Sequence, residues 1–202
     1  MYKAMWKKNV ADFFDRCAPE WDAWIEKNDE VINRILDLAK VCAGSDVLDV
    51  ACGTGIMFSY YLERNVKSVT GIDISPKMCG ITEEKFGHFE NVRIICGDVE
   101  EYSPEKQFDV VMVYNALPHF AKPGKLVRCL VSLLREGGHL VIAHGSSREV
   151  IDRRHRGKAE GVSVGLLPAE ELAEVLSEHL EIEHVISNDC MYLVSGTVGR
   201  IR

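Results

Sequence analysis

One stretch of the chain decides its fold: Val47-Leu48-Asp49-Val50-Ala51-Cys52-Gly53-Thr54-Gly55. The part Asp46–Val50 is apolar enough to form a buried strand, and the glycines that follow allow a tight turn in which the backbone can approach a ligand closely. A helix is expected next, over residues 56–64, with free N–H groups at its start. A strand, a glycine loop and a helix in this order predict a site for a nucleotide-like ligand.

The composition predicts a single globular domain that spans residues 1–202. Hydrophobic residues make up 47% and charged residues 27% of the chain, which is typical of soluble proteins. No apolar run is long enough to cross a bilayer, and the first residues lack the apolar stretch of a signal peptide, so we expect a cytoplasmic protein without a membrane partner. The seven cysteines form no Cys-x-x-Cys pair and suit reduced thiols. A net charge of −7 argues against a nucleic-acid partner.

Strands and helices alternate through most of the chain. Near-continuous apolar strands that alternate with helices predict a parallel sheet with helices on both faces, an α/β fold. The last two strands, 182–186 and 191–198, are separated by a short polar turn and must therefore pair as an antiparallel hairpin. The remaining strands are expected at 68–72, 92–96, 108–114 and 139–143, and the remaining helices at 9–16, 29–40, 75–86, 124–135 and 170–178.

Three acidic residues stand at the ends of three successive predicted strands: Asp49, Asp73 and Asp98. A carboxylate just before the glycine loop would repel a pyrophosphate but attract a cation. The loop spacing is also Ala-x-Gly-x-Gly rather than the Gly-x-Gly-x-x-Gly of dinucleotide enzymes. Both observations favour a cationic, phosphate-free adenosine ligand over the alternative of a nicotinamide dehydrogenase.

The order of these segments resembles the successive motifs of class I S-adenosylmethionine-dependent methyltransferases. The similarity covers roughly residues 30–200 and rests on Val47–Gly55, Gly71–Ser75, Gly97–Val99 and Phe108–Val111. It is closest in kind to the small-molecule enzymes related to the menaquinone-pathway C-methyltransferases. The resemblance implies a Rossmann-like, seven-stranded, mostly parallel sheet with an antiparallel last strand, and S-adenosylmethionine as the cofactor.

The resemblance also implies which residues bind this cofactor. Acidic residues and the glycine loop would hold the methionine and ribose parts, and apolar residues would pack the adenine, although plain core packing is the alternative for the apolar ones. Ala51 departs from the family, which often has glycine there. The implied cofactor-binding residues are Asp49, Ala51, Gly53, Gly55, Asp73, Ile74, Met78, Asp98, Val99 and Asn115.

The residues that act on the methyl acceptor should follow the fourth and fifth strands, because ligands of such sheets bind beyond the carboxyl ends of the strands. His119 and His144 follow these strands and are the candidate catalytic residues. A capping box of Ser146 and Glu149 predicts a helix after the fifth strand. On one face of that helix, Arg148 and His155 are candidates for substrate contact.

Residues 1–28 are predicted to form a helical lid over the core domain, residues 29–202. The stretch Phe13–Trp24 resembles the lead-in of the menaquinone-pathway relatives, and its aromatic side chains would exclude water. Trp21 and Tyr114 are the candidate residues for the substrate side of this lid. Residues 157–165, with three glycines, are a candidate second flap.

The acceptor itself is predicted only as a small molecule. The segment Asn115-Ala116-Leu117-Pro118 lacks the Asn/Asp-Pro-Pro-aromatic motif of enzymes that methylate nucleic-acid bases. No metal is predicted, although a site formed by His119, His144 and His155 is chemically reasonable. A protein that binds the cofactor as a sensor or subunit, without catalysis, is the alternative from a different class.

Overall fold

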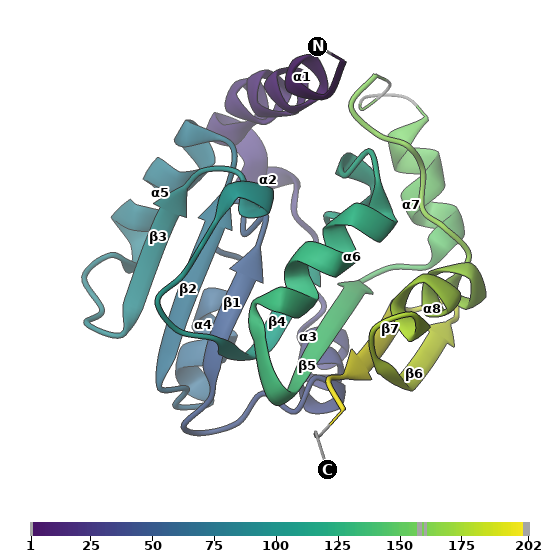
Figure 1. The fold of residues 1–202 in the computed structure, drawn as a ribbon. Helices are drawn as coiled ribbons and strands as arrows, with labels where there is room; N and C mark the ends of the chain where they lie inside the picture. Colours follow the sequence, from purple (N-terminus) through teal and green to yellow (C-terminus); the bar gives the residue numbers. More distant parts are fainter. Residues whose placement is uncertain (1, 157–158, 160, 200–202) are drawn as a thin grey trace.

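In the computed structural model, which describes residues 2–156, 159 and 161–199, seven strands form one sheet in the order β3-β2-β1-β4-β5-β7-β6 (Figure 1). Strands β1 to β5 run parallel to one another, whereas β7 is antiparallel to both β5 and β6. The predicted α/β fold with an antiparallel last strand is therefore confirmed. The strands are β1 Asp46–Val50, β2 Ser68–Asp73, β3 Val92–Cys96, β4 Phe108–Tyr114, β5 Leu134–His144, β6 Glu181–Ser187 and β7 Tyr192–Thr197.

Helices cover both faces of the sheet, and Figure 1 shows α6 and α8 in front of it with α3 and α4 behind. Three short 3-10 helices, η1 Ala18–Glu20, η2 Val99–Glu101 and η3 Leu117–His119, follow α1, β3 and β4. The α-helices of the described residues are α1 Tyr2–Cys17, α2 Trp21–Trp24, α3 Asp29–Leu38, α4 Phe58–Glu63, α5 Pro76–Phe86, α6 Pro123–Ser132, α7 Arg148–His155 and α8 Ala169–Ser177. None of them is long and apolar enough to cross a membrane.

The main core consists of two apolar layers, one on each face of the sheet, and a smaller cluster joins Val10 of α1 to Val162. Successive side chains of a strand point to opposite faces, so Leu48 packs in the layer that α6 and α8 cover, and Val47 packs in the layer that α3 and α4 cover. Strand β1 is buried along its whole length. Two acidic residues stand among its apolar ones: Asp46, which forms ion pairs with Lys67 and Lys106, and Asp49, which has no such partner among the described residues.

The structure corrects two predicted boundaries around β5. The helix predicted to reach residue 135 ends at Ser132, and β5 begins at Leu134 rather than at 139. Leu134 fits the apolar periodicity of the preceding helix, which is why the sequence placed it there. In the structure it pairs with Phe108 of β4, and the β4–β5 register shifts between Phe108 and Val110. At the other end of β5, helix α7 is capped by Ser147, whose Oγ accepts from Val150 N, and not by Ser146.

The N-terminal helix is longer than predicted and lies across the end of the sheet where the parallel strands terminate (Figure 1). It covers Tyr2–Cys17, where the apolar pattern indicated residues 9–16. Contacts with α5 tie α1 to the rest of the fold. Helix α1 therefore stands where the ligand of an open α/β sheet is expected. Part of the predicted flap, residues 157–158 and 160, lies outside the described residues.

Candidate functional site

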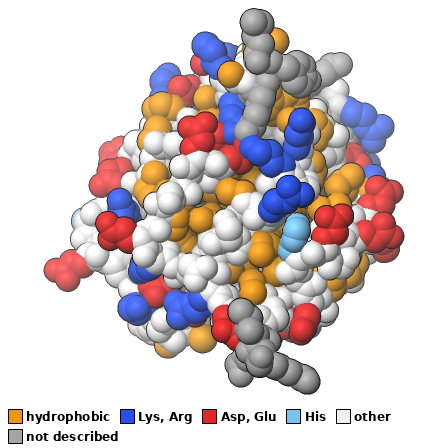
Figure 2. Space-filling view, in the orientation of Figure 1, with side chains coloured by type: hydrophobic (Ala, Val, Ile, Leu, Met, Phe, Trp, Pro, Cys, Tyr) orange, Lys and Arg blue, Asp and Glu red, His pale blue; other side chains and the backbone are white. Residues whose placement is uncertain are grey.

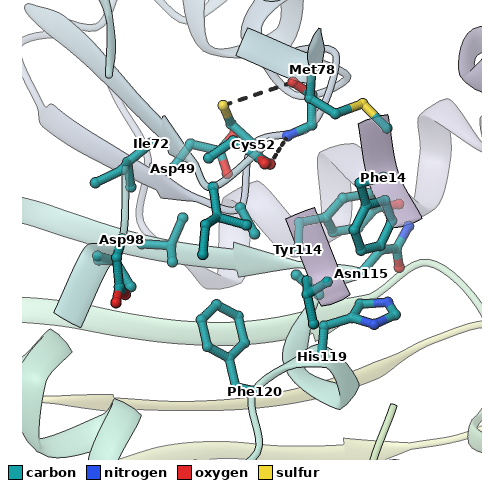
Figure 3. A pocket seen from close by; sticks show the side chains of 18 of the residues that line it. Phe14, Asp49, Cys52, Ile72, Met78, Asp98, Tyr114, Asn115, His119 and Phe120 are labelled. Carbon is teal, nitrogen blue, oxygen red and sulfur yellow. Dashed lines mark hydrogen bonds between the residues drawn. The ribbon is translucent and has the colours of Figure 1, made fainter. Parts of the chain in front are cut away.

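A cavity of about 260 Å³ opens beyond the carboxyl ends of β1, β2 and β4 (Figure 3). Its walls come from the loop after β1, the ends of β2, β3 and β4, and the N-terminal segment that covers them. Four predicted site residues, Gly55, His144, Arg148 and His155, are not part of its lining. The predicted residues that do line it are Trp21, Asp49, Ala51, Gly53, Asp73, Ile74, Met78, Asp98, Val99, Tyr114, Asn115 and His119.

The glycine loop turns through left-handed backbone conformations at Ala51, Gly53 and Gly55, with φ of 55°, 57° and 81°. Only glycine adopts this region without strain, so Ala51 holds a strained conformation at the edge of the cavity. At Gly55 a side chain has no room, because a Cβ there would lie 2.8 Å from the Phe86 ring. Gly55 therefore allows the loop to pack closely against α5 and does not itself line the cavity.

Asp49 lines the cavity with one unpartnered carboxylate oxygen, and the nearby Tyr61 hydroxyl favours its ionised form. The residue is 2% exposed, and its Oδ2 has no hydrogen-bond partner among the described residues. Burial and the nearby Asp73 carboxylate raise the pKa of Asp49 to about 8. A buried carboxylate is costly without a donor or a cation beside it. This position is therefore prepared for a positively charged ligand group.

Asp73 joins the end of β2 to the glycine loop. Its Oδ2 accepts from Gly53 N at 2.9 Å, and its Oδ1 accepts from Ser75 N at 2.8 Å. Burial raises the pKa of Asp73, while these amide donors favour its ionised form. A carboxylate oxygen can accept more than one hydrogen bond, so the two amides leave acceptor capacity for a ligand.

Asp98 is engaged by a residue that the sequence did not single out. Its Oδ1 accepts from Glu100 N at 2.9 Å, and its Oδ2 forms an ion pair with Lys7 of α1. Lys7 also reaches Glu100 Oε2 at 2.8 Å. Nothing in the sequence distinguishes Lys7 from any solvated lysine of a helix, because its partners lie more than ninety residues away.

Two further aspartates attach the N-terminal segment to the side of the cavity formed by the glycine loop and the start of α5. Asp15 accepts from Ser75 Oγ at 2.6 Å, and Asp22 accepts from Thr54 Oγ1 at 2.6 Å. Asp22 also forms an ion pair with Lys85 of α5. The described part of the predicted lid is therefore placed over the cavity by polar contacts as well as by its aromatic residues.

On the opposite side, α1 contacts the segment after β4. Trp6 Nε1 donates to His119 O at 3.0 Å. The Phe14 ring meets the His119 ring edge-on, with centroids 4.8 Å apart, and Trp21 packs against Phe14 in the same way. Figure 3 shows the His119 ring beside Asn115 and facing Phe14, on the side of the cavity away from Asp98.

The structure brings His119 and His155 into contact and buries His144 near enough for the charges of both rings to lower its pKa. The Nε2 atoms of His119 and His155 are 3.4 Å apart. Burial lowers the pKa of His119 to about 4. His144 is 1% exposed, its ring lies against Tyr192, and burial lowers its pKa to about 3. Its Nε2 is buried without a hydrogen-bond partner among the described residues and His144 does not line the first cavity, so its catalytic role stays a prediction.

No three histidine, cysteine, aspartate or glutamate side chains within the described ranges are grouped so that they could hold a metal ion. The alternative of a metal held by His119, His144 and His155 is thus without a ligand set in this part of the chain.

A second cavity, of about 740 Å³, lies beside α7 and shares Ala121 and Val164 with the first. Arg148 and His155, which miss the first cavity, line this one together with Arg156. Figure 2 shows Lys and Arg side chains gathered toward the end of this face where Figure 1 draws α1 and α7. The surroundings of the second cavity are therefore more basic than the net charge of the chain suggests.

Comparison with known proteins agrees with the fold and the loop. Residues 48–142 match a family model described as a methyltransferase domain. A malonyl-[acyl-carrier protein] O-methyltransferase of Acetivibrio thermocellus is 31% identical over 140 residues, which cover 68% of this chain and 49% of that protein. A demethylmenaquinone methyltransferase of Tropheryma whipplei is 34% identical over 108 residues, covering 52% and 44%. The chain spans about half the length of these relatives.

Solved structures show the same fold at lower identity. An N-methyltransferase, NodS, of Bradyrhizobium japonicum in complex with S-adenosylhomocysteine superimposes with a TM-score of 0.74 at 20% identity, covering 94% of this chain and 98% of that one. A methyltransferase of Haloferax volcanii in complex with its Trm112 activator gives a TM-score of 0.82 at 15% identity, covering 96% and 99%.

Residues 48–142 therefore match a methyltransferase domain, and in its fold and glycine loop the chain is similar to class I S-adenosylmethionine-dependent methyltransferases. Its relatives within that class include a demethylmenaquinone methyltransferase, as the sequence resemblance implied.

Proposed function

We propose that this chain transfers a methyl group from S-adenosylmethionine to a small-molecule acceptor by in-line displacement. The observation that supports this most is the Asp49 carboxylate, buried at the cavity with Oδ2 unpartnered in the described part of the chain. Such a group stabilises a cation and disfavours a phosphate. S-adenosylmethionine carries an ammonium group, a sulfonium group and no phosphate, so the residues present fit it.

When bound, the cofactor supplies an activated methyl group, and the protein supplies binding, orientation and exclusion of water. Asp49 and the loop at Gly53 would hold the amino-acid part, and Asp73 would accept from the ribose hydroxyls. Ile74, Met78 and Val99 would pack the adenine, with Asp98 at its polar edge and Asn115 below the methionyl part.

The acceptor would meet the side of the cavity formed by η3 and the N-terminal segment. Trp21, Tyr114 and His119 line it there. Residues 2–28 act in this proposal as a lid, since Trp6, Asp15 and Asp22 already attach them to both sides of the cavity. Closing a site in this way removes water and strengthens electrostatic interactions inside it. Two kinds of relative are named as O-methyltransferases, which favours an oxygen acceptor.

Two measurements test the proposal. S-adenosylmethionine and S-adenosylhomocysteine are expected to raise the melting temperature of the protein, whereas NAD is not. Transfer of labelled methyl from the cofactor is then measured across a panel of small hydroxyl, amine, thiol, carbon and carboxylate acceptors. Stabilisation by NAD alone would contradict the cofactor assignment. Tight binding of S-adenosylmethionine without transfer to any member of the panel would favour a non-catalytic binding protein.

A further inference from the structure

His119 and His155 are held by the backbone in one arrangement. His119 Nδ1 lies 2.8 Å from Val162 O, and His155 Nδ1 lies 2.8 Å from Ile151 O. A carbonyl oxygen can only accept, so each Nδ1 must carry the hydrogen. A neutral imidazole has one N–H, and the Nε2 of each ring is therefore a bare lone pair.

These two bare nitrogens face each other across 3.4 Å. With no proton between them, two acceptors oppose one another and neither has a partner. One proton on either Nε2 turns the contact into an N–H···N hydrogen bond. Two protons would place two positive charges side by side. The pair is thus built to take up one proton and to share it.

The pair stands where the two cavities meet. His119 lines the first and His155 lines the second. The two cavities share the lining residues Ala121 and Val164. A hydrogen-bond donor on a bound molecule would relieve the opposition of the two lone pairs.

The surroundings of His119 disfavour its charged form. The uncharged Phe14 ring of α1 lies edge-on against His119, Tyr114 of β4 lines the same cavity, and burial lowers the pKa of His144 of β5. Arg148 of α7 and Arg156, just after α7, line the same cavity as His155, and they outnumber the one carboxylate there, Asp152. Burial and the charge of a protonated His155 both lower the pKa of His119.

We propose that the His119–His155 pair receives the proton of the methyl acceptor, and that this acceptor is a hydroxyl or phenol rather than a carboxylate. In this step the O–H bond breaks and its electron pair stays on the oxygen. The proton binds to one Nε2, which then donates an N–H···N hydrogen bond to the facing Nε2. A carboxylate is already ionised at neutral pH and has no proton to give. The inference rests on the proposed methyl-transfer function, which it narrows to one class of acceptor.

The tautomers can be tested without any acceptor. Long-range ¹H–¹⁵N spectra of the labelled protein report which ring nitrogen carries the hydrogen. Above pH 8, His119 and His155 are both expected as the Nδ1–H form. Between pH 8 and pH 5, no more than one proton should add to the pair. His155→Asn and His119→Asn assign the signals, and His179→Asn, an exposed histidine after α8, is the control. An Nε2–H form at either ring overturns the proposal.

The acceptor class is tested with the labelled cofactor and the same panel. His155→Asn should lower transfer to hydroxyl and phenol acceptors by about 100-fold, the range of general-base catalysis, while cofactor affinity and the His179→Asn control stay within twofold. Transfer by the unchanged protein to carboxylates alone overturns the proposal, as does full activity of His155→Asn on hydroxyls. No transfer to any acceptor contradicts the proposed function, and the tautomers then still decide whether the pair binds a shared proton.

Discussion

The two sides of the cavity are built in different ways. On the side of β1, β2 and β3, carboxylates are held by amides of the adjoining loops, as Asp73 is by Gly53 and Ser75. On the side of β4 and β5, the His119 ring is held by Val162 O and by His155, which lie 43 and 36 residues further along the chain, while Trp6, 113 residues earlier, donates to its backbone carbonyl.

This difference suggests how each side responds to disturbance. The first side is part of the sheet, so it persists as long as β1 and β2 remain paired. The second side requires α1, α7 and residues 161–166 to dock at the same time. Segments with few buried contacts open more readily than a central sheet. We therefore expect the cofactor side to be the rigid half of the site and the acceptor side to be the half that assembles on closure.

The largest expected effect is on the rigid side. Asp49→Asn keeps the shape of the side chain but removes its charge, and should weaken S-adenosylmethionine binding by about 100-fold or more, since a buried charged partner is worth roughly 2–5 kcal/mol. Isothermal titration calorimetry measures the affinity, with Asp189→Asn in the exposed turn after β6 as the control. An affinity within threefold of the unchanged protein would remove Asp49 from the cofactor site.

Alanine substitutions at two glycines, Gly55 in the loop and Gly80 in α5, distinguish the steric demand of the loop from helix propensity. Gly55→Ala forces a side chain into the Phe86 ring at a positive φ and should cost about 2 kcal/mol or more of unfolding free energy. Gly80→Ala, in α5 with open space at its Cβ, should gain roughly 0.5–1 kcal/mol. Urea unfolding measures both changes. Equal effects at the two positions would show that the loop conformation is not under steric control.

Cofactor binding should be linked to a proton on the same side. Because the pKa of Asp49 is raised to about 8, its carboxyl group is protonated in the free protein at pH 6.5. A cationic ligand favours the ionised form, so binding should release close to one proton at this pH. Affinity should then rise by up to tenfold per pH unit and level off near pH 8. Calorimetry in buffers of different ionisation enthalpy counts the proton, and Asp49→Asn should release none.

The smallest expected effect is on the side that assembles. Trp6→Phe keeps an aromatic ring but removes the N–H that donates to His119 O. The loss of one such hydrogen bond, about 1 kcal/mol, should speed amide hydrogen exchange in α1 by roughly fivefold, since 1.4 kcal/mol corresponds to tenfold. Exchange in β1 should not change. A matching increase in β1 would mean that the two sides open as one unit and that the distinction between them is wrong.

Much of the cofactor side could be predicted from sequence because its determinants are local. A strand must be apolar where it is buried, so Asp49 and Asp73 at strand ends stand out, and a loop with positive φ needs glycines at fixed positions. These features follow one another within a few residues. Even so, the sequence could not indicate that the Asp73 carboxylate bonds the loop amides, or that Gly55 acts through Phe86 rather than toward the ligand.

On the acceptor side, a sequence argument ranked His119 and His144 together because both follow a strand. Tertiary structure separated them: the His144 ring is buried against Tyr192, whereas the His119 ring meets His155. The tertiary structure also brings Lys7 to Asp98 and Trp6 to His119, although nothing near either residue in the sequence indicates these contacts. Spacing along the chain determined which residues reach the ends of the strands. Only the docking of α1 and α7 decided which of them meet, because a hydrogen bond between distant segments depends on their packing and leaves no periodic trace in the sequence.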